Sequence, residues 1–378
     1  MNVFLIFIVL FFIMGITGLS YLFRKIYSAV TYFFPKIKKT IIIFLSLGIL
    51  TAAVVPAYFS LVVWFIVMMH FIVFLIISDA AVIIVKKFCK GKNIRFPDWI
   101  QFAYRSGAAA LAMTALLFVY ARYNMYHVIR TEYDVTLEKQ LSQPFTVVMI
   151  ADLHYGLSLD ADQLRTVADS IQNESPDAVI FCGDMVDENS TPEGLKEAFS
   201  ILGTIESRFG NYYVYGNHDR SKYTERAKIT DLPLTDAIEG NGIAILNDQI
   251  VTLNDDVVLV GRADLLASGG SRKSIDELLG ETDRSKAVIV ADHEPADYDS
   301  LEKAGCDLVL SGHTHGGQIF PLGFFNDLID FSELNYGYKK QGNLHAVVTS
   351  GVAGWGFDIR TEHHSEYVVI HMTGKQSG

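Results

Sequence analysis

The chain has 378 residues, 50% of them hydrophobic, and a formal net charge of −11, so its length suffices for two or three domains. Residues 1–130 hold 13 of the 31 Lys and Arg residues and only two acids, Asp79 and Asp98, which leaves 18 basic against 40 acidic residues in 131–378. Such an acidic domain is poorly suited to binding a phosphate backbone, which argues against nucleic acid as a partner.

The first third of the chain has the composition of a membrane region. A bilayer core requires about 20 consecutive apolar residues per helix, and four segments approach that length, at 3–23, 41–60, 62–85 and 106–123. The first segment lacks a basic n-region and an evident cleavage site, so we predict an anchor and not a cleaved signal peptide. Residues 1–123 are therefore expected to form a bundle of about four transmembrane helices, with Pro56 separating the second from the third.

Basic residues in the short loops predict the orientation. Five Lys and Arg residues lie within 24–39 and five within 86–95, whereas the N-terminus and the turn near Pro56 carry none. Because cytoplasmic loops are enriched in Lys and Arg, both basic loops are expected in the cytoplasm. Both termini and the C-terminal domain would then lie outside the cytoplasm, at the inner or plasma membrane, although Arg122 and Arg130 after the last span act against this orientation.

Two ionisable residues, His70 and Asp79, interrupt the third span. Such residues inside a membrane are functional candidates, but these two are nine positions apart and do not share one face of a helix. We expect a structural or packing role for both, and a functional role stays open.

The acidic part of the chain has an alternating strand and helix pattern. Residues 124–144 are predicted to be a polar linker that leads to a domain at 145–378. Helical patterns at 160–173 and 193–207 alternate with short apolar runs, each followed by a polar motif, which predicts an α/β domain with its site at the strand ends. We expect a four-layer sandwich of two mixed β-sheets flanked by helices. The predicted buried strands are 145–151, 178–182, 212–215, 287–290 and 308–310, and antiparallel strands are expected at 243–246, 249–253 and 257–260.

Five of these strand ends carry side chains of the kind that bind metals. Each alone is weak evidence, because a polar residue after a strand is often a turn residue or a helix cap, and the two histidines of Ser311–Gln318 alone suit a solvated loop. Carboxylate, amide and imidazole groups without a thiolate favour Mn, Fe or Zn over a structural zinc site. Seven groups are too many for one ion but fit two ions that share a carboxylate. The seven groups are Asp152, His154, Asp184, Asn217, His293, His313 and His315, and His218 stands beside Asn217 at the same strand end.

In this order, Asp-x-His, Gly-Asp-x-x-Asp, Gly-Asn-His-Asp, His and Gly-His-Thr-His resemble the calcineurin-like metallophosphoesterase family over about residues 145–372. The added Gly-Gly-Gln and the upstream His-Glu-Pro are similar to its bacterial membrane-associated branch. The membrane region has no counterpart in the family's core domain, so the resemblance says nothing about it.

The resemblance implies a role for each matching residue. His218 would not be a ligand but would stabilise charge on the phosphoryl oxygens or protonate the leaving oxygen, with Asp219 orienting its ring. Asp187 would support a ligand, and nothing is assigned to Arg262 or Asp264. Asp152, His154 and His315 would hold the first ion, Asp184 would bridge, and Asn217, His293 and His313 would hold the second.

These motifs predict a membrane-anchored dinuclear-metal phosphoesterase. It would hydrolyse a phosphate ester or pyrophosphate by attack of a metal-bridging hydroxide, a nucleophile near neutral pH because metal binding lowers the pKa of water from about 15.7 towards about 7. A lipid-linked phosphate is a candidate substrate, and the apolar stretch 320–331 is either a lip for the membrane or acyl chains or part of the core. The oligomeric state stays open.

Two alternatives remain. A UDP-2,3-diacylglucosamine pyrophosphatase of lipid A synthesis faces the cytoplasm, which conflicts with the orientation predicted above. A non-catalytic metal-binding sensor or transporter subunit would be expected to lack one or more of Asp184, Asn217 and His218, yet all three are present.

Overall fold

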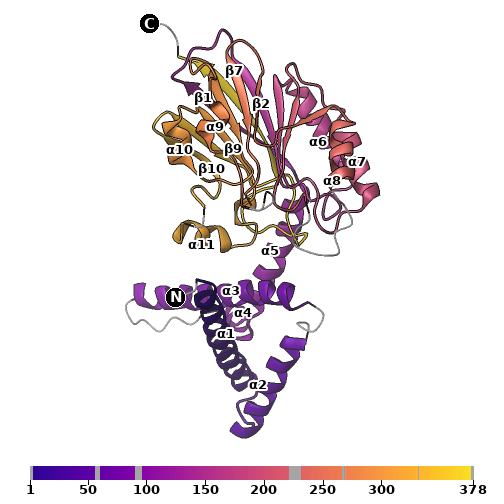
Figure 1. Ribbon diagram of the computed structural model, residues 1–378. Coiled ribbons are helices and arrows are strands. Elements are labelled where there is room, and N and C mark those ends of the chain that lie inside the picture. The colour runs from indigo at the N-terminus through magenta and orange to yellow at the C-terminus, as the bar shows by residue number, and fades with distance from the viewer. Residues whose placement is uncertain are drawn as a thin grey trace. The chain divides into compact units, whose positions relative to one another are not determined.

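The computed structural model (Figure 1) describes residues 3–55, 60–89, 96–220, 231–265, 268, 270–330 and 332–375, without the side chains of 3–14, 231 and 232. The chain divides into two compact units, Met1–Val119 and Tyr120–Gly378. The predicted break at Pro56 and the basic residues Lys90, Lys92 and Arg95 lie outside the described residues.

The first unit is entirely helical in its described part. Among the described residues, only two helices are long and apolar enough to cross a membrane, α3 (Leu61–Phe88) and α5 (Ala108–Tyr126). Within the described residues, two of the four predicted spans therefore meet this criterion, those at 62–85 and 106–123. α2 has 16 residues and at 1.5 Å per residue is about 24 Å long, short of a hydrocarbon core of about 30 Å. The remaining helices are α1 (Val3–Phe33), α2 (Lys39–Val54) and α4 (Asp98–Ser106).

Asp79 of α3 joins three helices of this unit. Its carboxylate accepts hydrogen bonds from the hydroxyls of Tyr21 on α1, at 2.7 Å, and Tyr104 on α4, at 2.8 Å, and it pairs with Lys25 of α1. His70 contacts the carbonyl of Ile66 through Nδ1, at 2.8 Å. These contacts agree with the structural role expected for both residues, because a buried charge is tolerated when it is paired and hydrogen-bonded.

The second unit contains two six-stranded mixed sheets. The first has the order β1-β12-β2-β3-β4-β5, and the second the order β10-β11-β9-β8-β7-β6. β5 pairs parallel with β4, so of the expected antiparallel strands only β6 and β7 form such a pair. The strands of the first sheet are β1 (Ile129–Leu137), β2 (Phe145–Ile150), β3 (Ala178–Cys182), β4 (Asn211–Val214), β5 (Ile243–Ile245) and β12 (Glu366–Gly374). Those of the second are β6 (Gln249–Thr252), β7 (Val257–Gly261), β8 (Ala287–Ala291), β9 (Leu308–Ser311), β10 (Gly337–Gln341) and β11 (Leu344–Val348).

Successive side chains of each strand point to opposite faces of its sheet. In β2, Val147 and Met149 belong to the core between the two sheets, whereas Val148 and Ile150 pack towards the helices that cover the first sheet. Helices α6 (Ala161–Asn173), α7 (Pro192–Leu202) and α8 (Asp231–Glu239) cover the first sheet, and α9 (Ile275–Leu279) and α10 (Tyr298–Lys303) cover the second (Figure 1). The prediction of two mixed sheets flanked by helices is confirmed.

The segment 124–144, for which the sequence predicts a linker, contains a strand of the domain. β1 pairs parallel with β12 along nine residues, Ile129 to Leu137. Its sequence alternates between polar and apolar residues because only one face of this edge strand is buried. The many polar residues give the segment the composition of a linker. Val135 and Leu137 enter the core between the sheets.

The stretch 320–330 is exposed and not core. It contains α11 (Leu322–Leu328), and Phe331 lies outside the described residues. Six apolar side chains have exposed fractions between 40 and 64%, namely Phe320, Leu322, Phe324, Phe325, Leu328 and Ile329. The core alternative for this stretch is therefore wrong for these six residues.

The role of β1 can be tested with neighbouring substitutions in the full chain. Leu137→Ala should lower the free energy of unfolding by about 2 to 5 kcal/mol, because it leaves a cavity in the core between the sheets. Thr136→Ala, at an exposed position one residue earlier, should have little effect. Thermal unfolding in detergent measures both. If both substitutions changed the free energy of unfolding by equally small amounts, the segment would be a linker and not part of the core.

Candidate metal centre

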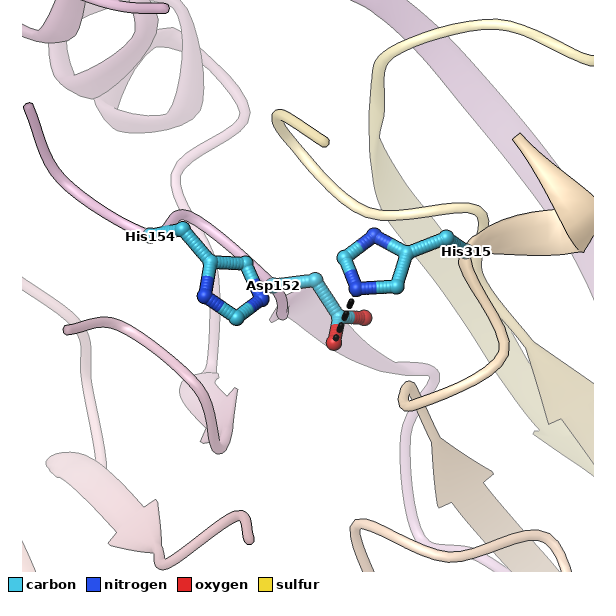
Figure 2. A group of neighbouring side chains, drawn as sticks. All are labelled: Asp152, His154 and His315. Atoms are coloured by element: carbon cyan, nitrogen blue, oxygen red, sulfur yellow. Dashed lines mark ion pairs between the residues drawn. The ribbon is translucent and has the colours of Figure 1, made fainter. Parts of the chain in front are cut away.

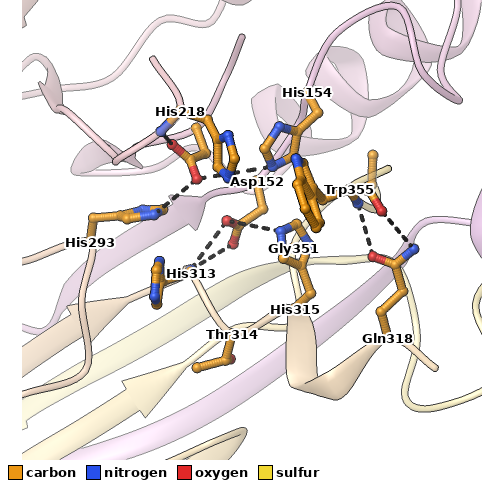
Figure 3. Close-up of polar contacts among 12 residues, drawn as sticks. Asp152, His154, His218, His293, His313, Thr314, His315, Gln318, Gly351 and Trp355 are labelled. Atoms are coloured by element: carbon orange, nitrogen blue, oxygen red, sulfur yellow. Dashed lines mark hydrogen bonds and ion pairs between the residues drawn. The ribbon is translucent and has the colours of Figure 1, made fainter. Parts of the chain in front are cut away.

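All the predicted ligands follow strands that run in parallel in their own sheet. Asp152 and His154 follow β2, Asp184 follows β3, and Asn217 and His218 follow β4 in the first sheet. In the second sheet His293 follows β8, and His313 and His315 follow β9. Figure 3 shows side chains from both sheets converging on one place. The structure thus brings all the predicted metal-type residues to the carboxyl ends of the central strands.

The backbone at this edge is unusual. Five of the predicted ligands have positive φ angles although none is a glycine, and such conformations cost of order 1 to 3 kcal/mol each. They persist when the surrounding structure holds them, and they cluster at functional sites. The five are Asp152 (φ 56°), His154 (41°), Asp184 (55°), His313 (72°) and His315 (52°).

Asp152, His154 and His315 form a first group (Figure 2), in which one ligand atom from each lies within 4.8 Å of the others. Nε2 of His315 is 3.7 Å from Oδ1 of Asp152, and the rings of His154 and His315 stack with centroids 5.2 Å apart. Neither ring nitrogen of His154, nor Nδ1 of His315, has a hydrogen-bond partner among the described residues, although these atoms are buried. Buried ring nitrogens without a protein hydrogen-bond partner are suited to binding a metal ion.

Asp152, Asp184 and His293 form a second group of ligand atoms within 4.8 Å. Nδ1 of His293 donates to the carbonyl of Cys182 at 2.7 Å, which leaves Nε2 as the ligand atom. That Nε2 is 3.1 Å from Oδ2 of Asp184 and 3.1 Å from Oδ1 of Asn217. Nδ1 of His313 lies 2.7 Å from the same Asn217 oxygen. The two groups adjoin, since Asp152 belongs to both.

Burial and charge together set the pKa values of these groups. Burial raises the pKa of Asp152 to about 6. Burial opposes ionisation of Asp184 as well, but attraction to His293 and other histidines holds the pKa of this carboxyl well below its ordinary value. Burial, with the charge of His154 and Arg360 adding to it, lowers the pKa of His315 well below the usual range. His293 shifts in the opposite direction, because burial is outweighed by attraction to Asp184, which raises its pKa well above the usual value.

Asp187 and Asp219 support the loops around these groups. Oδ2 of Asp187 is 3.7 Å from Nδ1 of His154, as expected for a residue that supports a ligand. Asp219 accepts hydrogen bonds from the backbone N–H groups of Gly216, Asp184 and Met185, between 2.7 and 3.0 Å. Its observed bonds therefore fix the loops after β3 and β4, not the ring of His218.

The ring of His218 has a different carboxylate partner from the one predicted. Its Nδ1 lies 2.9 Å from Oε2 of Glu188, a contact that the sequence motifs do not indicate. The reason is geometric, since the bonds of Asp219 run to backbone groups while Glu188 reaches the ring from the loop after β3. His218 also donates its backbone N–H to Oδ1 of Asp184 at 2.7 Å, and its ring is 5.3 Å from that of His154.

Sequence motifs do not indicate three other residues at the site, namely Glu188, Trp355 and Arg360. Glu188 adjoins the Gly-Asp-x-x-Asp motif, which gives a weak signal. The other two lie in the loop between β11 and β12, which has no motif. The guanidinium of the fully buried Arg360 donates to the carbonyls of His315, Ser350 and Ala353, between 2.6 and 2.9 Å. Its backbone N–H donates to the carbonyl of Ala121 on α5 at 3.0 Å.

Fold and site together define a class: a two-sheet α/β domain whose strand ends assemble adjoining groups of ligands for divalent metal ions. Residues 145–317 match the family model for calcineurin-like phosphoesterases. The match agrees with the family that the motifs resemble, over the part of the chain that holds the predicted ligands.

Relatives of the chain carry the same family name or a related one. An uncharacterised metallophosphoesterase of Helicobacter pylori is 31% identical over 65% of this chain and 64% of its own. A transmembrane protein with metallophosphoesterase domain from Danio rerio is 27% identical over 71% of this chain and 63% of its own. The phosphodiesterase YaeI of Escherichia coli is 29% identical over 62% and 84%. The chain spans less than two thirds of the length of the first two relatives.

Two glycines provide a test of how closely the loop after β9 is packed. Both Gly316 and Gly305 have positive φ angles, of 57° and 78°, so alanine strains the backbone at each. A Cβ at Gly316 would lie 2.8 Å from Cδ2 of His363, whereas a Cβ at Gly305 meets nothing within 4 Å. Gly316→Ala should therefore displace His315 and reduce the bound metal measured by mass spectrometry. Gly305→Ala should keep it, and equal metal contents in the two variants would contradict this account.

Proposed function

We propose that the chain is a membrane-anchored phosphoesterase that uses two divalent metal ions to hydrolyse a phosphate ester or pyrophosphate. The observation that carries the proposal is the pair of adjoining ligand groups, with Asp152 common to both and buried ring nitrogens of His154 and His315 without hydrogen-bond partners among the described residues. Unpartnered imidazole nitrogens beside buried carboxylates suit metal ions better than a purely structural network.

The proposed ligand assignment is the one that the family resemblance implies, and the distances are compatible with it. Oδ2 of Asp184 lies 4.0 Å from Nε2 of His154 and 3.1 Å from Nε2 of His293. It therefore reaches an imidazole from each proposed set, which supports Asp184 as the bridge. The donor set suits Mn, Fe or Zn. Asp152, His154 and His315 would hold one ion, and Asn217, His293 and His313 the other.

A pair of divalent ions supplies an activated water and stabilises the charge of an in-line displacement at phosphorus. The part of His218 is to donate a hydrogen bond or a proton to a phosphoryl or leaving oxygen. Glu188 holds the ring through Nδ1, which directs Nε2 away from that carboxylate. The backbone N–H of His218 also donates a hydrogen bond to Asp184. The residue proposed as the acid therefore also helps to position the carboxylate proposed as the bridge.

Four observations support the proposed membrane anchoring and the proposed class of substrate. α3 and α5 are long and apolar enough to cross a bilayer, and the relative from Danio rerio is named a transmembrane protein. The relative from Escherichia coli is named a phosphodiesterase. The exposed apolar side chains around α11 favour a lipid-linked phosphate among the candidate substrates. The proposed location is the inner or plasma membrane, with the domain outside the cytoplasm.

Substitutions at Asp184 and His218 separate a metal ligand from a residue that acts on the substrate. Asp184→Asn should remove bound metal and activity together. His218→Ala should keep the metal but lower turnover roughly 10²- to 10⁴-fold. Hydrolysis of p-nitrophenyl phosphate and bis(p-nitrophenyl) phosphate with Mn, together with metal analysis, measures both.

Loss of metal from the His218 variant would make this residue a ligand, and retention of metal and activity by Asp184→Asn would remove it as the bridge. No hydrolysis by the wild-type chain despite bound metal would favour the non-catalytic sensor or transporter subunit.

A C-terminal reporter tests the orientation. Because basic loops are retained in the cytoplasm, a reporter fused after Lys375 should give an extracytoplasmic signal, and one fused after Lys92 a cytoplasmic signal. Paired alkaline phosphatase and β-galactosidase fusions measure the two locations. A cytoplasmic signal at Lys375 would reverse the proposed orientation and would favour the pyrophosphatase of lipid A synthesis.

A further inference from the structure

Trp355 lies beside the proposed acid and remains 43% exposed. The centroid of its ring is 5.2 Å from that of His218, with 38° between the two planes. Figure 3 shows the indole next to the converging histidines, with Gln318 on its other side. No step described above uses this aromatic side chain.

The backbone of Trp355 is fixed by a buried amide. Oε1 of Gln318 accepts the N–H of Trp355 at 2.9 Å, and Nε2 of Gln318 donates to the carbonyl of Trp355 at 3.2 Å. The same Nε2 contacts the carbonyls of Phe357 and Ile359, and Gln318 itself is only 6% exposed. Gln318 comes three residues after His315, so the indole and the proposed ligand belong to one connected piece of structure.

Close packing before Trp355 adds to this rigidity. A Cβ at Gly354 would overlap Cε of Met125 and lie 2.8 Å from Cδ of Gln318, so a larger residue there would displace one of these side chains. A single exposed apolar side chain is ordinary on a protein surface. This one differs because its backbone is bonded on both sides and its ring contacts the residue proposed to meet the substrate.

A rigid, partly exposed indole is suited to one kind of ligand. Aromatic side chains offer a large flat surface and lose little conformational entropy on binding. They prefer offset or tilted contacts with other rings, and the stacking tolerates different ring types because every base has a π-face. His218 joins this surface to the metal centre, since its backbone holds Asp184. A ring close to the phosphorus of a bound ester would therefore reach the indole.

We propose that Trp355 forms a stacking subsite for a flat ring carried by the substrate, so that the centre prefers phosphoesters with an aryl or nucleobase group near the phosphorus. This inference rests on the proposed phosphoesterase function. Trp355 contributes to specificity, and the metal ligands and His218 are complete without it.

The test compares each substrate between the wild-type full chain and Trp355→Ala, so that differences in intrinsic reactivity cancel. p-Nitrophenyl phosphate and bis(p-nitrophenyl) phosphate carry rings, whereas glycerol 2-phosphate and glycerophosphocholine are a monoester and a diester without rings. Trp355→Ala should lower kcat/KM about tenfold for the substrates with rings, equivalent to about 1.4 kcal/mol, and less than twofold for the others. Trp355→Phe should restore most of the difference. Trp99→Ala is the matched control, since Trp99 is an exposed tryptophan on α4.

Equal losses for both classes of substrate, or no loss for either, would overturn the subsite. Metal content and thermal unfolding show whether the variant remains folded. If the wild-type chain hydrolyses neither class, the proposed function fails, and calorimetry of phenylphosphonate against methylphosphonate then decides the subsite alone. Tighter binding of phenylphosphonate that disappears in Trp355→Ala supports it, and equal binding of the two ligands rejects it. Arms with thymidine 5′-(p-nitrophenyl phosphate) and methyl p-nitrophenyl phosphate, which share a leaving group, distinguish a nucleoside from an aryl ring.

Discussion

The burial of several ionisable groups at one edge of the two sheets is the constraint on which the rest of the domain depends. Asp152, Asp184 and His293 are each at most 1% exposed, and removing a charge from water is costly unless it is paired. The surrounding groups act on the backbone that carries these side chains. Asp219 collects the N–H groups of two loops, and Arg360 collects carbonyls from two others. The negative charge of Asp219 thus fixes backbone donors around the site, and the positive charge of Arg360 fixes backbone acceptors around it.

Much of the fold follows from patterns that a sequence displays directly. Strands such as β3 and β8 are buried at every position, so they are continuous apolar runs, and the polar residue at the end of each marks the site. β1 fails this rule because one of its faces is exposed. The apolar segments at 41–60 and 62–85 have the composition of membrane spans, but composition does not fix helix length, and α2 ends after 16 residues.

The sequence predicts the contacts of a site residue when its partner belongs to the same group of motifs. It does not predict contacts whose partner comes from a segment without a motif. Asp187 lies near His154, in agreement with its place in the motif. The partner of His218 is different, because two carboxylates, Glu188 and Asp219, lie within reach of neighbouring loops and only the three-dimensional path of the backbone decides between them. Trp355 and Arg360 reach the centre from the far end of the chain, through a loop whose sequence has no spacing signal.

The hydrogen bond from Arg360 to Ala121 links the end of α5 to the loop beside the metal centre. One arginine contacts both the last turns of α5 and the carbonyl of His315, and Asn124 of the same helix end donates to the carbonyl of Arg360 at 3.2 Å. The end of the apolar helix thus supports the loop that carries Arg360. This helix end is therefore not interchangeable with another: a protease cut or a fusion joint placed after residue 126 removes part of the support of Arg360, whereas one placed before residue 120 leaves that support intact.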